Sequence, residues 1–317
     1  LAHQWFGDKI TCGSWNDIWL NEGFATYLSG LVVENLDGNT AFRSWKSGLT
    51  ANITSQAGGS VYVPEADISN VNRIFSSRLS YNKGAMVVNM LRYKLGDTHF
   101  FQGMKNYLMD TNLAYKYAQS SDLKYHLETV SGLSLTEFFN DWVYGQGYPT
   151  YQFQVVNLGN NQAKITVNQS QSHSSVSFFE MPVPLRLFGT NGQFLDVVLN
   201  NTSNNQVFIE NVPFTVTSVS FDVEKQLISK NNQVTLGTDD FVQNATMRLY
   251  PNPTSSQLNL KLPENLKVDK VIFYNTLGQV ISTSTATSWD VSGFANGVYL
   301  LKVFNTSGVQ TFRFIKE

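Results

Sequence analysis

The sequence predicts a multidomain α+β protein that is mainly helical at its start and then continues into two β-sandwich domains. Its 317 residues are enough for two or three domains that each bury a core of their own. Apolar residues in the first part recur at helical spacing, whereas those in the remainder alternate with polar residues. We therefore predict a helical domain at 1–148, a β-sandwich at 149–236 and a second β-sandwich at 247–317, with a linker at 237–246.

The first part carries two apolar stripes with the three- and four-residue spacing of a helix face. Gly96 and Gly132 punctuate the expected helices, and Ser120 begins a pattern typical of a helix start. The stripes consist of Leu20, Phe24, Tyr27, Leu28 and Leu31, and of Met86, Met90, Leu91 and Leu95.

The later residues change to the period of two that half-buried strands show. Residues 151–155 and 163–167 alternate apolar and polar side chains, and Asn191-Gly192 supplies a hairpin turn. Glycine, asparagine and proline turns separate the short strands of the last part. We expect those strands at 258–262, 270–274, 299–304 and 311–315.

Composition and charge exclude several classes of protein. A net charge of −2 gives no electrostatic case for binding nucleic acid or an anionic membrane. Aromatic residues make up 13% of the chain and charged residues only 15%, which favours an exported protein rich in β-structure. The single Cys12 rules out an intrachain disulfide framework. No apolar run approaches the roughly 18 residues that span a bilayer.

Two possible metal ligands stand near the amino end, where eighteen residues lie between His3 and Glu22. In the zinc-peptidase motif H-E-x-x-H, two imidazoles four residues apart share one helix face. A carboxylate from a following helix completes a three-ligand site and leaves one position open for water. Leu1-Ala2-His3 would supply the x-x-H of this motif, and Glu22 would supply the carboxylate. We expect the first His and the Glu of the motif to lie upstream of Leu1.

Three motifs, in order along the chain, resemble the gluzincin aminopeptidases, the family of membrane alanyl aminopeptidase and leukotriene hydrolase. They are His-Gln-Trp-Phe-Gly from His3, Trp-Leu-Asn-Glu-Gly-Phe-Ala around Glu22, and Tyr-Asn-Lys-Gly-Ala from Tyr81. The resemblance covers the helical part and continues more weakly to about residue 230. It implies that the helical part is half of a thermolysin-like catalytic domain.

The resemblance also implies a role for each of these residues. His3 and Glu22 would bind Zn²⁺, which lowers the pKa of its bound water to about 7 and polarises the scissile carbonyl. Tyr81 would donate a hydrogen bond to the oxyanion of the tetrahedral intermediate. The substrates would be peptides with a free amino terminus, which the family recognises partly through a Gly-x-Met-Glu-Asn segment before the zinc helix. A superficially similar run at Met86 has no Glu and follows the helix, so we interpret Met86 as a core residue.

Each candidate also has a purely structural interpretation. His3 could be a packed histidine beside aromatic residues, Glu22 a solvated carboxylate on a helix, and Tyr81 a residue of a helix start. Their combined spacing favours the family roles. The other histidines have no partners at ligand spacing, so we expect surface or capping roles for His99, His126 and His173. We expect Cys12 to be a small buried residue.

Residues 247–317 resemble the type IX secretion sorting domain, a small β-sandwich at the end of proteins exported by Bacteroidetes-type bacteria. The resemblance rests on Tyr-Pro-Asn-Pro at 250–253, Asn-Thr-Leu-Gly-Gln at 275–279 and Asn-Gly-Val-Tyr at 296–299. It implies that the type IX secretion machinery is a partner, and that the protein is secreted or attached to the outer membrane surface. The alternative is an immunoglobulin-like accessory module. The terminal position and the Pro-Asn-Pro entry favour sorting.

Together the motifs predict a fragment of a secreted zinc aminopeptidase that removes amino-terminal residues from peptides by attack of a zinc-activated water. Because the first zinc His and the general-base Glu are expected upstream of Leu1, we expect the chain alone to be inactive. Two alternatives stay open. One is a non-catalytic, surface-attached binding protein derived from the same family. The other is a homologue with a different hydrolytic task, such as epoxide hydrolysis.

Overall fold

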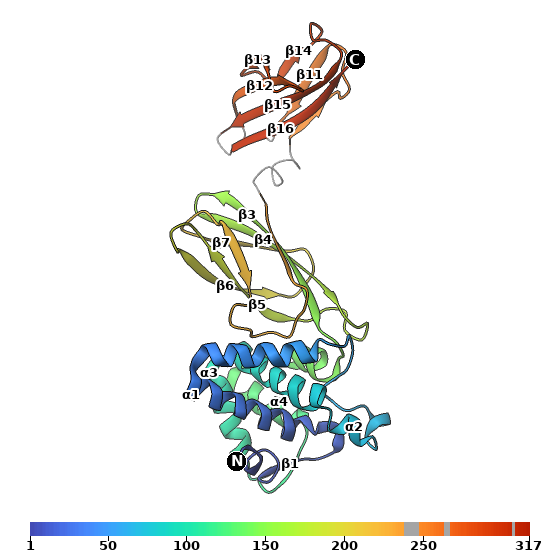
Figure 1. Cartoon of the computed structure of the whole chain (residues 1–317), viewed down its shortest axis with the longest axis vertical. Helices are drawn as coiled ribbons and strands as arrows, with labels where there is room; N and C mark the ends of the chain where they lie inside the picture. The colour runs from blue at the N-terminus through green and yellow to red at the C-terminus, as the bar shows by residue number, and fades with distance from the viewer. Residues whose placement is uncertain (238–246, 263–266, 306–307) are drawn as a thin grey trace. The chain divides into compact units, whose positions relative to one another are not determined.

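The computed structural model describes residues 1–237, 247–262, 267–305 and 308–317. Helices dominate the first part of the chain and strands the rest (Figure 1). The predicted multidomain α+β class is therefore confirmed. All but the first residue of the predicted linker lies outside the described residues. Within the described ranges, no helix is both long and apolar enough to cross a membrane.

The helical region consists of two long helices, several short ones and one pair of short parallel strands. In chain order its elements are η1 (Ala2–Gln4), β1 (Ile10–Cys12), η2 (Trp15–Asp17), α1 (Trp19–Ile53), η3 (Glu65–Asp67), α2 (Val71–Ile74), the π-helical turn η4 (Ser77–Lys83), α3 (Gly84–Met109), β2 (Lys116–Ala118), α4 (Ser120–Ser131), α5 (Thr136–Phe138) and η5 (Phe139–Tyr144).

Helices α1 and α3 form the centre of this region, and most residues of the predicted apolar stripes are buried in its core. Phe24 on α1 and Met86 on α3 are both fully buried. Each long helix is interrupted by one glycine with a left-handed backbone, Gly38 at φ 81° and Gly96 at φ 73°. These interruptions kink the helices because a residue with positive φ cannot continue a right-handed helix.

A buried polar network fixes the start of α1 against the start of α4. The amide and hydroxyl of Ser120 both donate to Asp17 Oδ1, at 3.1 and 2.6 Å. The same hydroxyl accepts a hydrogen bond of 2.9 Å from the indole of Trp19. Helix α4 begins at Ser120, as predicted, with a capping box formed by Gln119 and Asp122.

The central β-region forms two sheets, and buried and exposed residues alternate along several of their strands. The sheet orders are β7-β4-β3-β9 and β6-β5-β8. Asn191 and Gly192 both have positive φ in the turn between β5 and β6, as the predicted hairpin requires. The strands are β3 (Pro149–Gly159), β4 (Gln162–Gln171), β5 (Met181–Phe188), β6 (Phe194–Asn201), β7 (Gln206–Asn211), β8 (Ser218–Phe221) and β9 (Gln233–Gly237).

The terminal β-region also has two sheets, with the orders β10-β11-β14 and β13-β12-β15-β16. Its core contains Phe273 and Phe314, whose rings meet edge to face at 6.0 Å, together with Trp289. Its strands are β10 (Arg248–Tyr250), β11 (Gln257–Lys261), β12 (Val268–Asn275), β13 (Val280–Ser284), β14 (Ser288–Asp290), β15 (Gly297–Asn305) and β16 (Gly308–Lys316).

The chain divides into two compact units, each discontinuous in sequence. The boundary cuts through strands β3, β4, β7 and β9, so it does not follow the three predicted domains, which stay a prediction. The first unit contains Leu1–Gln154, Ile165–Phe208 and Thr217–Thr235, and the second contains Val155–Lys164, Ile209–Val216 and Leu236–Glu317. Every residue of the candidate site lies in the first unit.

Candidate metal and active site

The three residues predicted to act in metal binding and catalysis lie together. His3 on η1 and Glu22 on the first turn of α1 approach each other, with His3 Nε2 3.4 Å from Glu22 Oε2. Tyr81, on the turn η4, is close enough to Glu22 for the carboxylate to influence its phenol. All three line one cavity of about 880 Å³. The fold thus brings together segments that are far apart in the sequence.

A hydrogen bond to the backbone determines which nitrogen of the His3 ring carries a hydrogen. Its Nδ1 lies 3.1 Å from the carbonyl oxygen of Phe6. Because a carbonyl only accepts, Nδ1 must carry the hydrogen, and in a neutral imidazole Nε2 then presents its lone pair. That lone pair faces the carboxylate of Glu22. Two acceptors facing each other are stabilised by a cation between them, either a proton or a metal ion.

The separation of these two atoms suits zinc. A tetrahedral zinc ion with bonds of about 2.1 Å to nitrogen and oxygen places its ligand atoms about 3.4 Å apart. The His3 to Glu22 distance equals that separation without any rearrangement. A backbone carbonyl bound to the second ring nitrogen is also the partner that metal-ligating histidines usually have. The pair therefore fits two positions of a zinc site.

A third ligand does not join the pair within the described ranges. There, no group of three His, Cys, Asp or Glu side chains is placed to hold a metal ion. The Glu22 side chain is only 12% exposed, whereas that of His3 is 54% exposed. The site is thus well packed on the α1 side and open on the η1 side.

Tyr81 is prepared to act as a hydrogen-bond donor. Burial raises the pKa of its phenol, and the nearby carboxylate of Glu22 raises it further. The phenol therefore keeps its proton at neutral pH and can donate it in a directed hydrogen bond. The hydroxyl lies in the same cavity as the two metal-ligand candidates.

Two glycines that sequence reasoning gave no role hold this arrangement together. Gly23 follows Glu22, and Gly84 lies three residues after Tyr81. A Cβ atom added to Gly23 would lie 2.9 Å from Gly84 Cα, which is closer than real Cβ contacts. The α1 and α3 backbones can approach this closely only because both positions are glycine. Both glycines stand inside the sequence motifs, which was the available signal.

The apolar wall of the cavity comes mostly from one face of α1. Ala25, Leu28, Leu31, Val32 and Leu36 line it, and of these Leu28 and Leu31 belong to the stripe predicted from the sequence. Val32 and Leu36 are 56% and 74% exposed. A peptide side chain in this cavity would therefore meet an aliphatic surface.

The remaining histidines and Cys12 make local contacts. His99 Nδ1 lies 3.3 Å from the Leu95 carbonyl, His126 Nε2 lies 3.1 Å from Asp110 Oδ2, and His173 contacts Ser175. Burial is the main cause that raises the pKa of the Cys12 thiol to about 11, so the thiol stays protonated at neutral pH. Cys12 is partly buried, whereas a buried position was expected for it.

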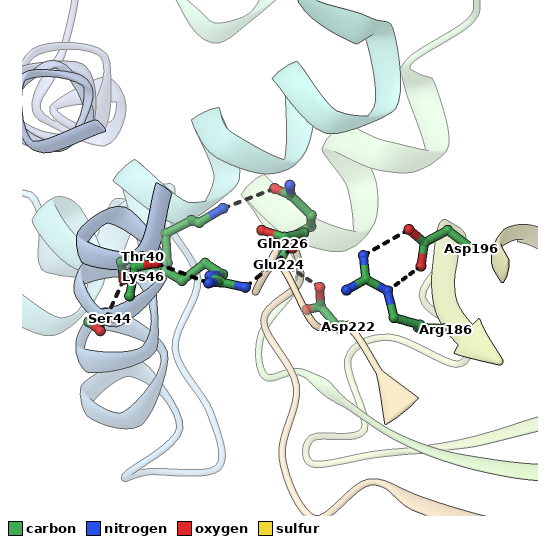
Figure 2. A network of polar contacts seen from close by, with 9 residues as sticks. Thr40, Ser44, Lys46, Arg186, Asp196, Asp222, Glu224 and Gln226 are labelled. Carbon is green, nitrogen blue, oxygen red and sulfur yellow. Dashed lines mark hydrogen bonds and ion pairs between the residues drawn. The ribbon is translucent and has the colours of Figure 1, made fainter. Parts of the chain in front are cut away.

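A second polar cluster joins α1 to the turn at 222–226, and Figure 2 shows it. Lys46 Nζ donates to Gln226 Oε1 at 3.2 Å, and Arg43 pairs with Glu224 at 3.4 Å. Asp222 accepts hydrogen bonds from the amides of Gln226 and Leu227 and so shapes the turn. Because the donors of α1 find their acceptors in the turn, we interpret the cluster as structural.

Comparison with known proteins identifies two parts of the chain. Residues 1–142 match the peptidase family M1 domain. Residues 248–317 match the secretion system C-terminal sorting domain. The chain therefore carries a peptidase family M1 domain over its helical region and a sorting domain at its end. Both resemblances predicted from the motifs are confirmed.

Several curated proteins are similar to this chain. Tricorn protease-interacting factor F2 of Thermoplasma volcanium is 30% identical over 228 residues, covering 66% of this chain and 28% of its own length. Leucyl aminopeptidase of Saccharolobus solfataricus is 29% identical over 221 residues, covering 67% of this chain and 27% of its own length. This chain thus spans about a quarter of the length of these relatives.

A solved structure is also similar. Aminopeptidase A of Legionella pneumophila, in complex with aspartic acid, aligns with a TM-score of 0.56 and 16% identity. The alignment covers 74% of this chain and 26% of that chain. At this level of identity the likeness shows a shared fold alone.

Proposed function

We propose that this chain is part of a secreted zinc aminopeptidase that removes amino-terminal residues from peptides. The observation that carries the proposal is the 3.4 Å separation of His3 Nε2 and Glu22 Oε2, in a cavity that Tyr81 also lines. The family M1 match and the relatives named aminopeptidases support the choice of reaction.

In this proposal His3 and Glu22 hold the zinc ion, and the Phe6 carbonyl keeps the His3 lone pair directed toward it. When bound, zinc supplies an activated water and polarises the scissile carbonyl. Tyr81 donates its hydroxyl proton in a hydrogen bond to the substrate carbonyl oxygen as negative charge develops there. The aliphatic wall of α1 would contact apolar side chains of the substrate.

The 317-residue chain alone is inactive in this proposal. A catalytic zinc site usually has three protein ligands and needs a general base near the attacking water. The described residues supply two ligands, and the carboxylate that could act as a base is itself one of them. The third ligand and the base would come from residues outside the 317.

The sorting domain indicates secretion or surface attachment. We further propose that the type IX secretion machinery of a Bacteroidetes-type bacterium recognises it, and that the protein ends at the outer membrane surface or outside the cell. The three-domain division at 1–148, 149–236 and 247–317 belongs to the same proposal, with the last domain acting as an address that takes no part in catalysis.

The test compares the product of the whole gene with the 317-residue chain on amino-acid anilides. The whole product should release the anilide in the presence of zinc and lose this activity to a chelator, while the 317-residue chain should release none. Turnover by the 317-residue chain would disprove its inactivity. A whole product that binds zinc and turns over no anilide would favour the surface binding protein, and turnover of a lipid epoxide instead would favour the epoxide hydrolase.

A further inference from the structure

Lys83 is a fully buried lysine in the segment that carries Tyr81. It is the last residue of η4, two positions after Tyr81, and only 1% of it is exposed. Its ammonium donates to the carbonyl oxygen of Gly59 at 2.8 Å and to that of Gly147 at 3.1 Å. One side chain therefore joins η4 to two separate loops.

The backbone of both loops is shaped to present these carbonyls. Gly59 has a φ of 103° and Gly147 a φ of 88°, values in the left-handed region that favours glycine. The amide of Gly59 also donates to Gln146 Oε1 at 3.0 Å, which ties the two loops to each other. The acceptors of Lys83 are thus held in place independently of Lys83 itself.

This environment is costly for a lysine. Burial lowers the pKa of Lys83 to about 7, and the positive charges of Arg78 and Arg73 act in the same direction. An apolar side chain of similar length would fill the space without that cost. The lysine contributes what an apolar side chain cannot, namely two directed hydrogen bonds.

The other side of the Tyr81 segment is fixed by packing. Gly84 follows Lys83 directly and lies against Gly23, next to Glu22. The segment is thereby held at two points, by hydrogen bonds at Lys83 and by the glycine contact at Gly84. Tyr81 lies just before both.

We infer that Lys83 is a positioning residue that sets the location of the Tyr81 hydroxyl relative to Glu22. Without its two hydrogen bonds, η4 loses its attachment to the loops at Gly59 and Gly147, and the Tyr81 ring moves within the cavity. The catalytic value of this position rests on the proposed function, but the position itself can be measured without catalysis.

The experiment places 3-fluorotyrosine at position 81 of the 317-residue chain and records its ¹⁹F NMR signal. Lys83→Met is compared with Lys46→Met, a matched control because Lys46 is only 2% exposed and lies in the other polar cluster. Lys83→Met should shift or broaden the ¹⁹F signal, whereas Lys46→Met should leave it unchanged. An unchanged signal in folded Lys83→Met, or an equal change in Lys46→Met, would overturn the inference.

A second measurement needs no variant at Lys83, in case Lys83→Met does not fold. In the ¹⁵N-labelled wild-type chain, the Nζ protons of Lys83 should exchange with water far more slowly than those of an exposed lysine such as Lys105. Equal exchange rates would show that the two hydrogen bonds do not persist, and the inference would fail.

Kinetics of the whole gene product separate this inference from the proposed function. Lys83→Met should lower kcat about 10- to 100-fold with little change in KM, as a displacement of about 1 Å does in other enzymes. If the ¹⁹F signal shifts and kcat does not change, Lys83 positions Tyr81 but Tyr81 has no catalytic role. If kcat falls without a ¹⁹F shift, the positioning inference is wrong and the proposed function is unaffected.

Discussion

Gly23 and Gly84 lie in direct backbone contact where α1 packs against α3, and neither position has room for a side chain. A Cβ atom on Gly84 would lie 3.0 Å from Gly23 Cα. Because Glu22 precedes one glycine and Tyr81 lies three residues before the other, this contact sets how closely the carboxylate and the phenol approach. The candidate site depends on it as much as on the functional side chains.

Gly84→Ala should therefore destabilise the protein by about 1–3 kcal/mol, the usual cost of forcing an extra methyl group into a packed core. Chemical denaturation measures the change. Gly48→Ala is the matched control, since Gly48 lies on α1 with open space around its Cβ position. There the substitution should leave stability unchanged or raise it by up to about 1 kcal/mol. Equal effects at both positions would show that the glycine contact is loose.

Tyr81→Phe should lower kcat of the whole gene product by about 100- to 1,000-fold, because it removes one hydrogen-bond donor from the developing oxyanion. Its zinc content should not change, since the phenol is not a metal ligand in the proposal. Tyr125→Phe serves as control, because Tyr125 is 64% exposed and lies outside the cavity. A fall in activity of less than about tenfold would argue against the role of Tyr81.

The burial of Lys83 should make the free energy of unfolding depend on pH. Its pKa falls from 10.5 to about 7 on folding. Between these values the unfolded chain binds the proton and the folded chain does not, so stability rises with pH. From pH 7 to 9 the gain should be on the order of a few kcal/mol. Urea unfolding at several pH values measures it, and Lys83→Met should remove this part of the slope.

The sorting domain should act only when folded. Phe273 is 1% exposed in the core of the terminal β-region, and Leu277 is 82% exposed on the surface of that region. Phe273→Asp should unfold the terminal β-region and leave the protein inside a type IX-competent cell. Leu277→Asp should allow normal export. Cell fractionation with an antibody distinguishes the two results. Export of both variants would show that the folded sandwich is not what the machinery recognises.

The sequence allowed prediction of the parts of this protein that depend on local pattern. Helical spacing predicted the cores of α1 and α3, and alternation predicted β3 and β4. Turn residues between short apolar runs predicted β11, β12, β15 and β16. Among the strands that were not predicted, β10, β13 and β14 have only three to five residues and lie at a sheet edge. A strand that short carries little periodic signal.

In the candidate site, too, the residues within recognisable motifs were predicted and the contacts between distant residues were not. His3, Glu22 and Tyr81 were predicted because their motifs carry recognisable chemistry, and the structure places them together. Whether they act as predicted is not yet tested. The Gly23–Gly84 contact and the Lys83 hydrogen bonds were not predicted, because they join residues distant in sequence, and only the packing of helices and loops decides such contacts.

Zinc binding by His3 and Glu22 is tested most directly by X-ray diffraction. A crystal of the 317-residue chain would be soaked in zinc and measured at the zinc absorption edge. If His3 and Glu22 bind zinc, an anomalous peak should lie about 2 Å from both His3 Nε2 and Glu22 Oε2, and no peak should appear there in His3→Ala. The His99→Ala control should keep the peak, because His99 makes only a local helix contact. Zinc bound elsewhere on the chain, with the His3–Glu22 pair empty, would contradict the proposal that these two residues are zinc ligands.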